Sequence, residues 1–117
     1  MKVINRIKSS EEFVTTVKKG RVLKNSSYVV HYLKNDLNAC RIGLSISKKV
    51  GNAVVRVRSK RQVRAMCDSL INYANHAFDI VIVIRQDFIA KSFEDNKNAL
   101  RKILSEIGIK EWKKEQN

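Results

Sequence analysis

The chain has 117 residues, 44% of them hydrophobic, which is enough for one buried core and too few for two. Its 24 lysines and arginines against 11 acids give a net charge of +13, which favours an anionic partner over a small neutral substrate. The longest apolar run, residues 80–84, is too short to span a bilayer, and the charged first residues do not resemble a signal peptide. We therefore expect a cytoplasmic protein with no membrane partner.

The chain opens with a basic lead-in and a short helix. Residues 1–8 lack a strong period and are expected to be extended and loosely ordered, with the potential to touch phosphate. Ser9 or Ser10 can cap a helix over about 9–19, whose first turn carries acids that suit the helix dipole. Gly20 is expected to end it.

Four segments have the composition of β-strands. A short strand is expected at 21–23, followed by a strand at 27–33 that is rich in β-branched and aromatic residues and a turn at 34–38. Residues 41–47 alternate large apolar with small polar side chains, which predicts one apolar face and one small polar face. Residues 78–84 form a continuous apolar run, which is typical of a central strand covered on both faces.

Two further helices complete the predicted order. From Asn52 to about Asn75 the period is helical, and its predicted core side consists of Val63, Met66, Cys67, Leu70 and Ala74. Ser92 can cap a last helix that ends near Gly108. The order α-β-β-β-α-β-α predicts an α+β fold in a single compact domain over residues 1–117, with a loosely ordered end at 111–117.

The cysteines and histidines form no metal-binding pattern. Cys40 and Cys67 match neither a zinc spacing nor a disulfide framework, so we expect two reduced, packed thiols. His31 and His76 each lack a second ligand at suitable spacing. No cofactor or metal held by protein side chains alone is expected.

The strongest signal is a cluster of cations between residues 47 and 64. No acid occurs between Asp36 and Asp68 to offset Lys48, Lys49, Arg56, Arg58, Lys60, Arg61 and Arg64. A polyanion would relieve their mutual repulsion, and the forked donors of arginine suit structured RNA. A solvated basic face on an ordinary helix is the plainer interpretation, but the long absence of acids favours binding.

An anion site is predicted where this stretch enters the long helix. Gly51 lets the backbone turn sharply and approach a ligand, Asn52 can cap the helix, and the free N–H groups of the first turn point outward. The basic side chains that follow would let the helix track a phosphate backbone over several nucleotides.

Residues 49–64, Lys-Val-Gly-Asn-Ala-Val-Val-Arg-Val-Arg-Ser-Lys-Arg-Gln-Val-Arg, closely resemble the Arg-Asn-Arg signature of the bacterial ribonuclease P protein subunit. Phe13, the Lys-Lys-Gly at 18–20 and the segment 41–49 fall in the order and spacing of that family. The chain departs from the pattern at Val57, where the family usually has Asn between the two arginines. A hydrogen-bonding contact at that position is therefore not carried over.

The resemblance implies one four-stranded mixed sheet with three helices and a rare left-handed βαβ crossover, as in ribosomal protein S5 domain 2. It implies an enzyme subunit in a ribonucleoprotein that removes the 5′ leader of precursor tRNA. In that family the catalytic RNA performs the hydrolysis with bound magnesium ions, so no catalytic side chain is expected here. The implied partners are the catalytic RNA and precursor tRNA, and small anions such as sulfate or phosphate are expected to bind the free protein.

Two sets of residues match binding sites of the family. The first, called the helix set, is expected to bind the catalytic RNA: Lys49, Gly51, Asn52, Arg56, Arg58, Lys60, Arg61 and Arg64. The second, called the cleft set, is expected to bind the leader: Phe13, Val17, Tyr28, His31, Ser45, Ser47 and Lys48. Val17 and His31 stand where the family often has aromatics, so stacking is expected to shift in part to Tyr28 or Tyr32. For Phe13, plain core packing is the competing interpretation.

Two other functions remain open from the residues. A small basic ribosomal or RNA-assembly protein would share this composition without any role in cleavage. A protein nuclease acting alone would need clustered carboxylates or paired histidines, and the scattered Asp36, Asp68, Asp79 and Asp87 form no such motif.

Overall fold

The computed structural model describes residues 1–111, and its helices and strands follow the predicted order. The helices are α1 (Ser10–Lys19), α2 (Ala53–Leu70) and α3 (Phe93–Ile107), and the strands are β1 (Arg21–Lys24), β2 (Tyr28–Lys34), β3 (Arg41–Ile46) and β4 (Phe78–Ile84). Short 3-10 helices occur at Val3–Asn5, Lys48–Val50, Tyr73–Asn75 and Gln86–Ala90. Of the predicted loose end at 111–117, all but Glu111 lies outside the described residues.

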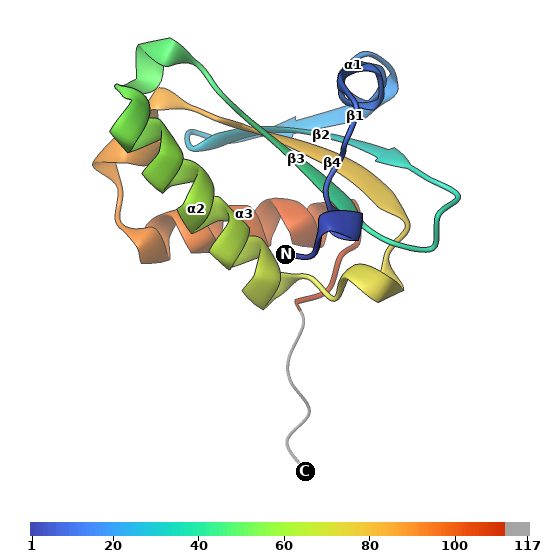
Figure 1. Cartoon of the computed structure of the whole chain (residues 1–117). Coiled ribbons are helices and arrows are strands. Elements are labelled where there is room, and N and C mark those ends of the chain that lie inside the picture. Colours follow the sequence, from blue (N-terminus) through green and yellow to red (C-terminus); the bar gives the residue numbers. More distant parts are fainter. Residues whose placement is uncertain (112–117) are drawn as a thin grey trace.

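The four strands form one mixed sheet in the order β1-β2-β4-β3. β2 is antiparallel to β1 and to β4, whereas β3 runs parallel to β4, so α2 is the crossover between the two parallel strands. The prediction that β4 is a central strand is confirmed. Figure 1 shows α1 on one face of the sheet and α2 and α3 on the other.

Alternation along the strands gives the sheet a core face, toward α2 and α3, and an α1 face. Ile80 and Ile82 of β4 belong to the core, whereas Val81 between them is buried outside that cluster. β3 follows the same rule, because Ile42 belongs to the core and Gly43 lies beneath α1. The predicted division of β3 into an apolar face and a small polar face is thus confirmed.

The prediction that the long helix extends to Asn75 is wrong, because α2 ends at Leu70. The backbone instead becomes extended at Ile71, and the side chain is buried. Ala74, predicted on the core side, is exposed within the 3-10 helix Tyr73–Asn75. Beyond the helix, the carbonyl oxygen of Tyr73 accepts a hydrogen bond from the N–H of Cys40 at 2.8 Å, so a long-range contact replaces a helical one.

Residues 1–8 lie along the edge of β3, contrary to the expectation of a loosely ordered lead-in. Arg6 forms a parallel β-bridge with Ile42, and the N–H of Ile7 donates to the carbonyl oxygen of Ile42 at 3.0 Å. The buried side-chain amide of Asn5 donates to the carbonyl oxygen of Cys40 at 3.2 Å. The segment therefore covers part of an otherwise open strand edge.

Candidate nucleic-acid interface

The start of α2 has the cap that the sequence predicts. The side-chain oxygen of Asn52 accepts a hydrogen bond from the N–H of Val55 at 3.0 Å, so one amide of the first turn is satisfied within the protein. Gly51 has an extended backbone, and a Cβ at this position would lie 2.9 Å from Cγ1 of Val55. Nε of Arg56 donates back to the carbonyl oxygen of Gly51 at 3.2 Å. The start of the helix thus carries a positioned cation, and glycine is needed there for space.

The side chains of α2 divide into a core side and a basic side. The core side consists of Val63, Met66, Cys67 and Leu70, all buried as predicted. On the basic side, Arg58 and Arg61 are exposed, whereas Arg56, Lys60 and Arg64 are half-buried. Val57 is 50% exposed, which confirms that it lies within the basic arc.

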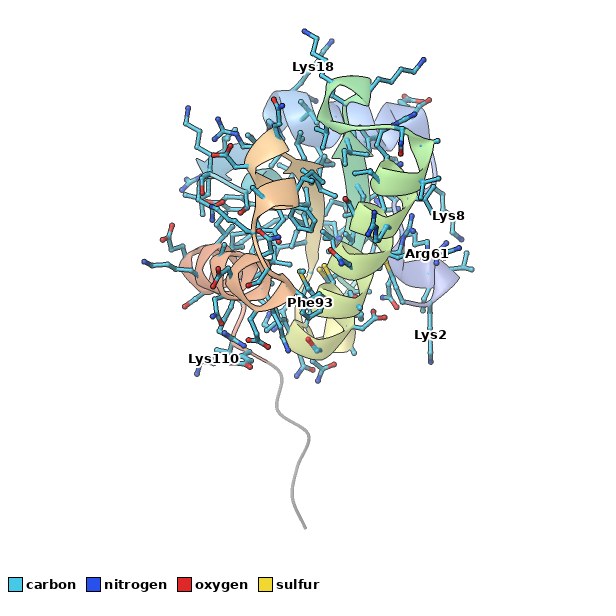
Figure 2. All side chains as sticks on the ribbon, turned by 90° about the vertical axis from the view of Figure 1, so that its left-hand side faces the viewer. Lys2, Lys8, Lys18, Arg61, Phe93 and Lys110 are labelled. Atoms are coloured by element: carbon cyan, nitrogen blue, oxygen red, sulfur yellow. The ribbon has the colours of Figure 1, made fainter. Side chains whose placement is uncertain are left out.

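The cations of α2 have no carboxylate partner within residues 1–111. The ion pairs formed there involve the Met1 amino group, Arg41 and Arg101, and none involves a side chain of α2. Figure 2 shows Arg61 directed outward on a side of the molecule that also carries Lys2 and Lys8. This surface therefore concentrates positive charge without internal compensation.

The cleft set is centred on Phe13, which lies against β3. A Cβ at Gly43 would stand 3.0 Å from Cδ2 of Phe13, so the ring rests where the strand has no side chain. Ser45, two residues further along β3, faces the same side of the sheet and is half-buried. Val17 is half-buried on α1. An aromatic ring and small side chains thus meet between α1 and the sheet.

The prediction that Tyr28 contributes to this cleft is wrong. Tyr28 is fully buried on the core face, where its hydroxyl donates to the carbonyl oxygen of Asn96 at 2.8 Å and its ring packs edge-on against Phe88. Tyr32 lies on the same face by alternation and packs edge-on against Phe78, so it does not supply the expected stacking either.

His31 lies on the α1 face of β2, three residues beyond Tyr28 and on the opposite side. Its Nδ1 is buried and has no hydrogen-bond partner among residues 1–111. Burial lowers the pKa of His31, which favours the neutral ring. The α1 side of the sheet therefore holds an imidazole whose surroundings favour its neutral form and whose Nδ1 is buried.

Ser47 and Lys48 of the cleft set and Lys49 of the helix set lie in the connection between β3 and α2. The hydroxyl oxygen of Ser47 accepts a hydrogen bond from the N–H of Lys49 at 3.1 Å and begins the 3-10 helix Lys48–Val50. All three residues are exposed. Two lysines thus stand where β3 leads into α2.

A hollow of about 180 Å³ is lined by residues of both α1 and α2. Phe13 and Arg64 both line it, together with Gly43 and the N-terminal residue Arg6. Arg6 is the residue that sequence reasoning missed, because only the basic character of residues 1–8 pointed to it. The hollow makes the basic side of α2 continuous with the cleft beside α1.

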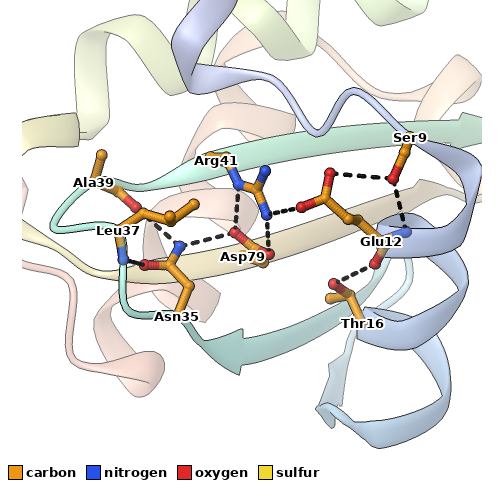
Figure 3. A network of polar contacts seen from close by, with 8 residues as sticks. All are labelled: Ser9, Glu12, Thr16, Asn35, Leu37, Ala39, Arg41 and Asp79. Atoms are coloured by element: carbon orange, nitrogen blue, oxygen red, sulfur yellow. Dashed lines mark hydrogen bonds and ion pairs between the residues drawn. The ribbon is translucent and has the colours of Figure 1, made fainter.

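An ion-pair network ties α1 to the sheet (Figure 3). Arg41 of β3 donates from Nε and Nη2 to the carboxylate of Asp79 at 2.9 and 2.6 Å, and from Nη2 to Glu12 of α1 at 2.8 Å. Asn35 donates to the same carboxylate of Asp79 at 2.8 Å. The hydrogen bond from Arg41 holds the pKa of Glu12 below its ordinary value. Because Glu12 directly precedes Phe13, the network also positions the aromatic ring.

Residues 1–111 contain no group of three or more His, Cys, Asp or Glu side chains arranged for a metal ion. Cys40 and Cys67 are buried free thiols, as predicted, and burial raises the pKa of Cys40 to about 12. Over the same residues, no helix is both long and apolar enough to cross a membrane. The cations, the aromatic ring and the small polar groups suit the binding of RNA.

Comparisons with known proteins agree with this picture. The family model described as Ribonuclease P matches residues 1–108. The Ribonuclease P protein component of Bacillus cereus is 39% identical over 115 residues, which covers 97% of this chain and 100% of the relative. That of Mesoplasma florum is 38% identical over 99 residues, covering 84% and 90%.

Solved structures give the same result for the fold. The RNase P protein of Staphylococcus aureus superposes with a TM-score of 0.79 at 30% identity, covering 90% of this chain and 96% of that one. The RNase P protein of Thermotoga maritima gives a TM-score of 0.76 at 27% identity, with 86% and 96% covered. The likeness therefore extends over nearly the whole architecture.

Proposed function

This chain belongs to the ribonuclease P protein family, and from that membership we propose how its two surfaces divide the work of the holoenzyme. It is an RNA-binding subunit of the tRNA-processing ribonucleoprotein endoribonuclease, in which catalysis resides in the RNA. The helix set docks on the catalytic RNA, and the cleft set holds the 5′ leader of precursor tRNA. Residues 1–117 act together as one RNA-binding domain.

The proposal for the helix set rests on one observation: within residues 1–111, no carboxylate pairs with a cation of α2. Such a surface gains most from a folded polyanion, because each neutralised phosphate releases condensed counterions. Arginine adds forked hydrogen bonds that a lysine cannot make. In the free protein, small anions such as sulfate or phosphate occupy part of this surface.

The cleft set without Tyr28 supports leader binding. Phe13 offers an aromatic face, Ser45 and Ser47 offer hydroxyl groups, and Lys48 offers a cation to the phosphates. Val17 supplies apolar contact, and His31 supports the cleft from the sheet beneath α1, where its Nδ1 is buried. An extended single strand presents both base faces and phosphates to such a cleft.

The magnesium ions of the reaction belong to the active site of the RNA. The protein residues contribute by holding the precursor in place, and the cations of α2 reduce the repulsion between the RNA partners. We therefore expect the protein to matter most at low magnesium concentration, where fewer metal ions neutralise the phosphates.

Reconstituted leader cleavage tests this function. The wild-type protein should stimulate removal of the leader by the catalytic RNA at low magnesium. Phe13→Ala should weaken binding of precursor tRNA by about 5- to 150-fold, since one stacked base contributes about 1–3 kcal/mol, and should leave the binding of mature tRNA unchanged. Val14→Ala, an exposed apolar change at the next residue, is the matched control.

Two outcomes would contradict the proposal. An absence of stimulation by wild-type protein would favour a small basic RNA-assembly protein instead. Equal losses for precursor and mature tRNA in Phe13→Ala would remove the leader from the cleft and leave the ring with a packing role.

A further inference from the structure

A second hollow, of about 150 Å³, lies on the side of α2 away from Phe13. It is bounded by α2, by the 3-10 helix Gln86–Ala90 and by the start of α3, and its principal lining residues are Val55, Arg58, Gln62, Ile89, Lys91 and Phe93. Only Arg58 belongs to the helix set. The other lining residues form a part of the surface to which the family resemblance assigns no role.

Exposed apolar side chains gather around this hollow. Phe93 is 40% exposed and Ile89 is 43% exposed. Val54 and Val57 are also exposed, and they line a separate hollow together with Arg58 and Arg61. Figure 2 shows Phe93 and Arg61 on the same face of the molecule. The basic arc is thus bordered by an apolar surface that includes an aromatic ring.

Polar groups at the hollow are available to a ligand. The carboxamide of Gln62 makes no hydrogen bond within residues 1–111, and the guanidinium of Arg58 has no carboxylate partner there. The ammonium group of Lys91 donates to the hydroxyls of Ser26 and Ser27, which hold it in position without neutralising it. An aromatic face, an amide and two cations therefore surround a space suited to one nucleobase.

We propose that this hollow receives a single unpaired nucleotide of the RNA that docks on the helix set. The base stacks on Phe93 against Val55 and Ile89, its edge bonds to Gln62, and its phosphates lie between Arg58 and Lys91. Structured RNA is recognised largely through unpaired bases that stack on aromatic side chains and meet polar groups at their edges. The net charge of +13 favours RNA over a protein partner of ordinary composition. The inference rests on the proposed docking of the helix set.

Equilibrium binding of the catalytic RNA to variants at Phe93 tests the proposal. Phe93→Ala should weaken binding by about 5- to 150-fold, the range expected for the loss of one stacked base. Phe93→Leu keeps apolar contact with α2 but cannot stack, so it should bind nearly as weakly as Phe93→Ala. Phe93→Tyr should bind within about twofold of the wild type, because the aromatic face is kept. Leu37→Ala, which removes a comparable exposed side chain from the β2–β3 loop, should have no effect.

Two further measurements separate this proposal from the one on which it rests. A base stacked on an aromatic ring neutralises no phosphate, so Phe93→Ala should leave the salt dependence of binding unchanged. Arg61→Ala removes a cation and should flatten that dependence. Chemical probing of the RNA should show one base that wild-type protein protects and Phe93→Leu exposes. Wild-type affinity in Phe93→Leu, with a flattened slope in Arg61→Ala, would overturn the stacked nucleotide and keep the docking surface. An unchanged slope in Arg61→Ala would overturn both.

Discussion

Arg41 on β3 and the arginines of α2 carry the same functional group in opposite circumstances. Arg41 is largely buried and donates to two carboxylates, Asp79 and Glu12. Arg58 and Arg61 are exposed and have no carboxylate partner within residues 1–111. The ion pairs of Arg41 stabilise the packing of α1 against the sheet. The unpaired arginines of α2 remain available to an external anionic partner, although they repel one another in the free protein.

Because all of these residues are arginines, their burial and their neighbours decide whether they stabilise the fold or remain available to bind RNA. Arg41 lies between α1 and the sheet, where it and Asp79 are largely buried and an unpaired charge would be costly. The arginines of α2 lie opposite the buried side of the helix, where solvent or phosphate can reach them. Removing the two kinds of arginine should therefore have separate effects on stability and on RNA affinity.

The largest expected effect is on stability. Arg41→Met should lower the free energy of unfolding by about 3–5 kcal/mol, because it leaves the buried carboxylate of Asp79 without its counter-charge. Arg61→Met should change it by no more than about 0.5 kcal/mol, as expected for an exposed side chain. Chemical denaturation at pH 7 measures both. Similar losses of unfolding free energy in Arg41→Met and Arg61→Met would show that the two arginines do not differ in their contribution to stability.

The next effect is on RNA affinity. The double variant Arg61→Ala, Arg64→Ala should flatten the logarithmic dependence of catalytic-RNA affinity on salt by about 0.7–0.9 for each phosphate contact that is lost. Lys102→Ala, which removes an exposed cation from α3, is the matched control and should leave the slope nearly unchanged. A salt titration of RNA binding provides the measurement. A wild-type slope in the double variant would show that α2 does not face the RNA.

The smallest expected effect concerns pH. Burial lowers the pKa of His31 below its ordinary value of 6.5, so the unfolded chain binds more protons in this range. Stability should therefore fall as the pH drops through about 6.5, and His31→Gln should reduce that fall. Glu12 affects stability at lower pH, because its pKa in the folded protein is below the ordinary value of 4.5. Its contribution to stability is present above pH 4.5 and is lost as the pH falls further.

Denaturation midpoints between pH 5 and 8 test this assignment. Glu12→Gln should keep the wild-type pH dependence between 5 and 7, although its overall stability is lower. If His31→Gln also kept that dependence unchanged, another group would be responsible, and His31 would not be held neutral by its surroundings.

The sequence predicted those features that local chemistry determines. Ser9 caps α1, its hydroxyl oxygen accepting from the N–H of Glu12 at 3.0 Å, because a capping residue acts within one turn. Asn52 caps α2 for the same reason. The basic side of α2 was also predictable, because helical spacing alone separates it from the core side.

The features that the sequence could not predict depend on long-range contacts. Tyr28 was assigned to the wrong face because β2 carries large side chains on both sides, so alternation gave no direction. The pair of Arg41 and Asp79 joins residues 38 apart, and no local pattern connects them. Past the end of α2, Ile71 is buried and Tyr73 is hydrogen-bonded to Cys40, and these contacts exist only in the assembled fold.

The strand order has a consequence for biosynthesis. β4 lies between β2 and β3 but is the last of the four strands to be translated. While a ribosome is still making residues 78–84, β2 and β3 have no hydrogen-bonding neighbour between them, and their apolar sides stay open to other nascent chains. The sheet can thus close only as a late, concerted step, once nearly three quarters of the chain has been made, and any delay in that step extends the period in which chaperones are needed.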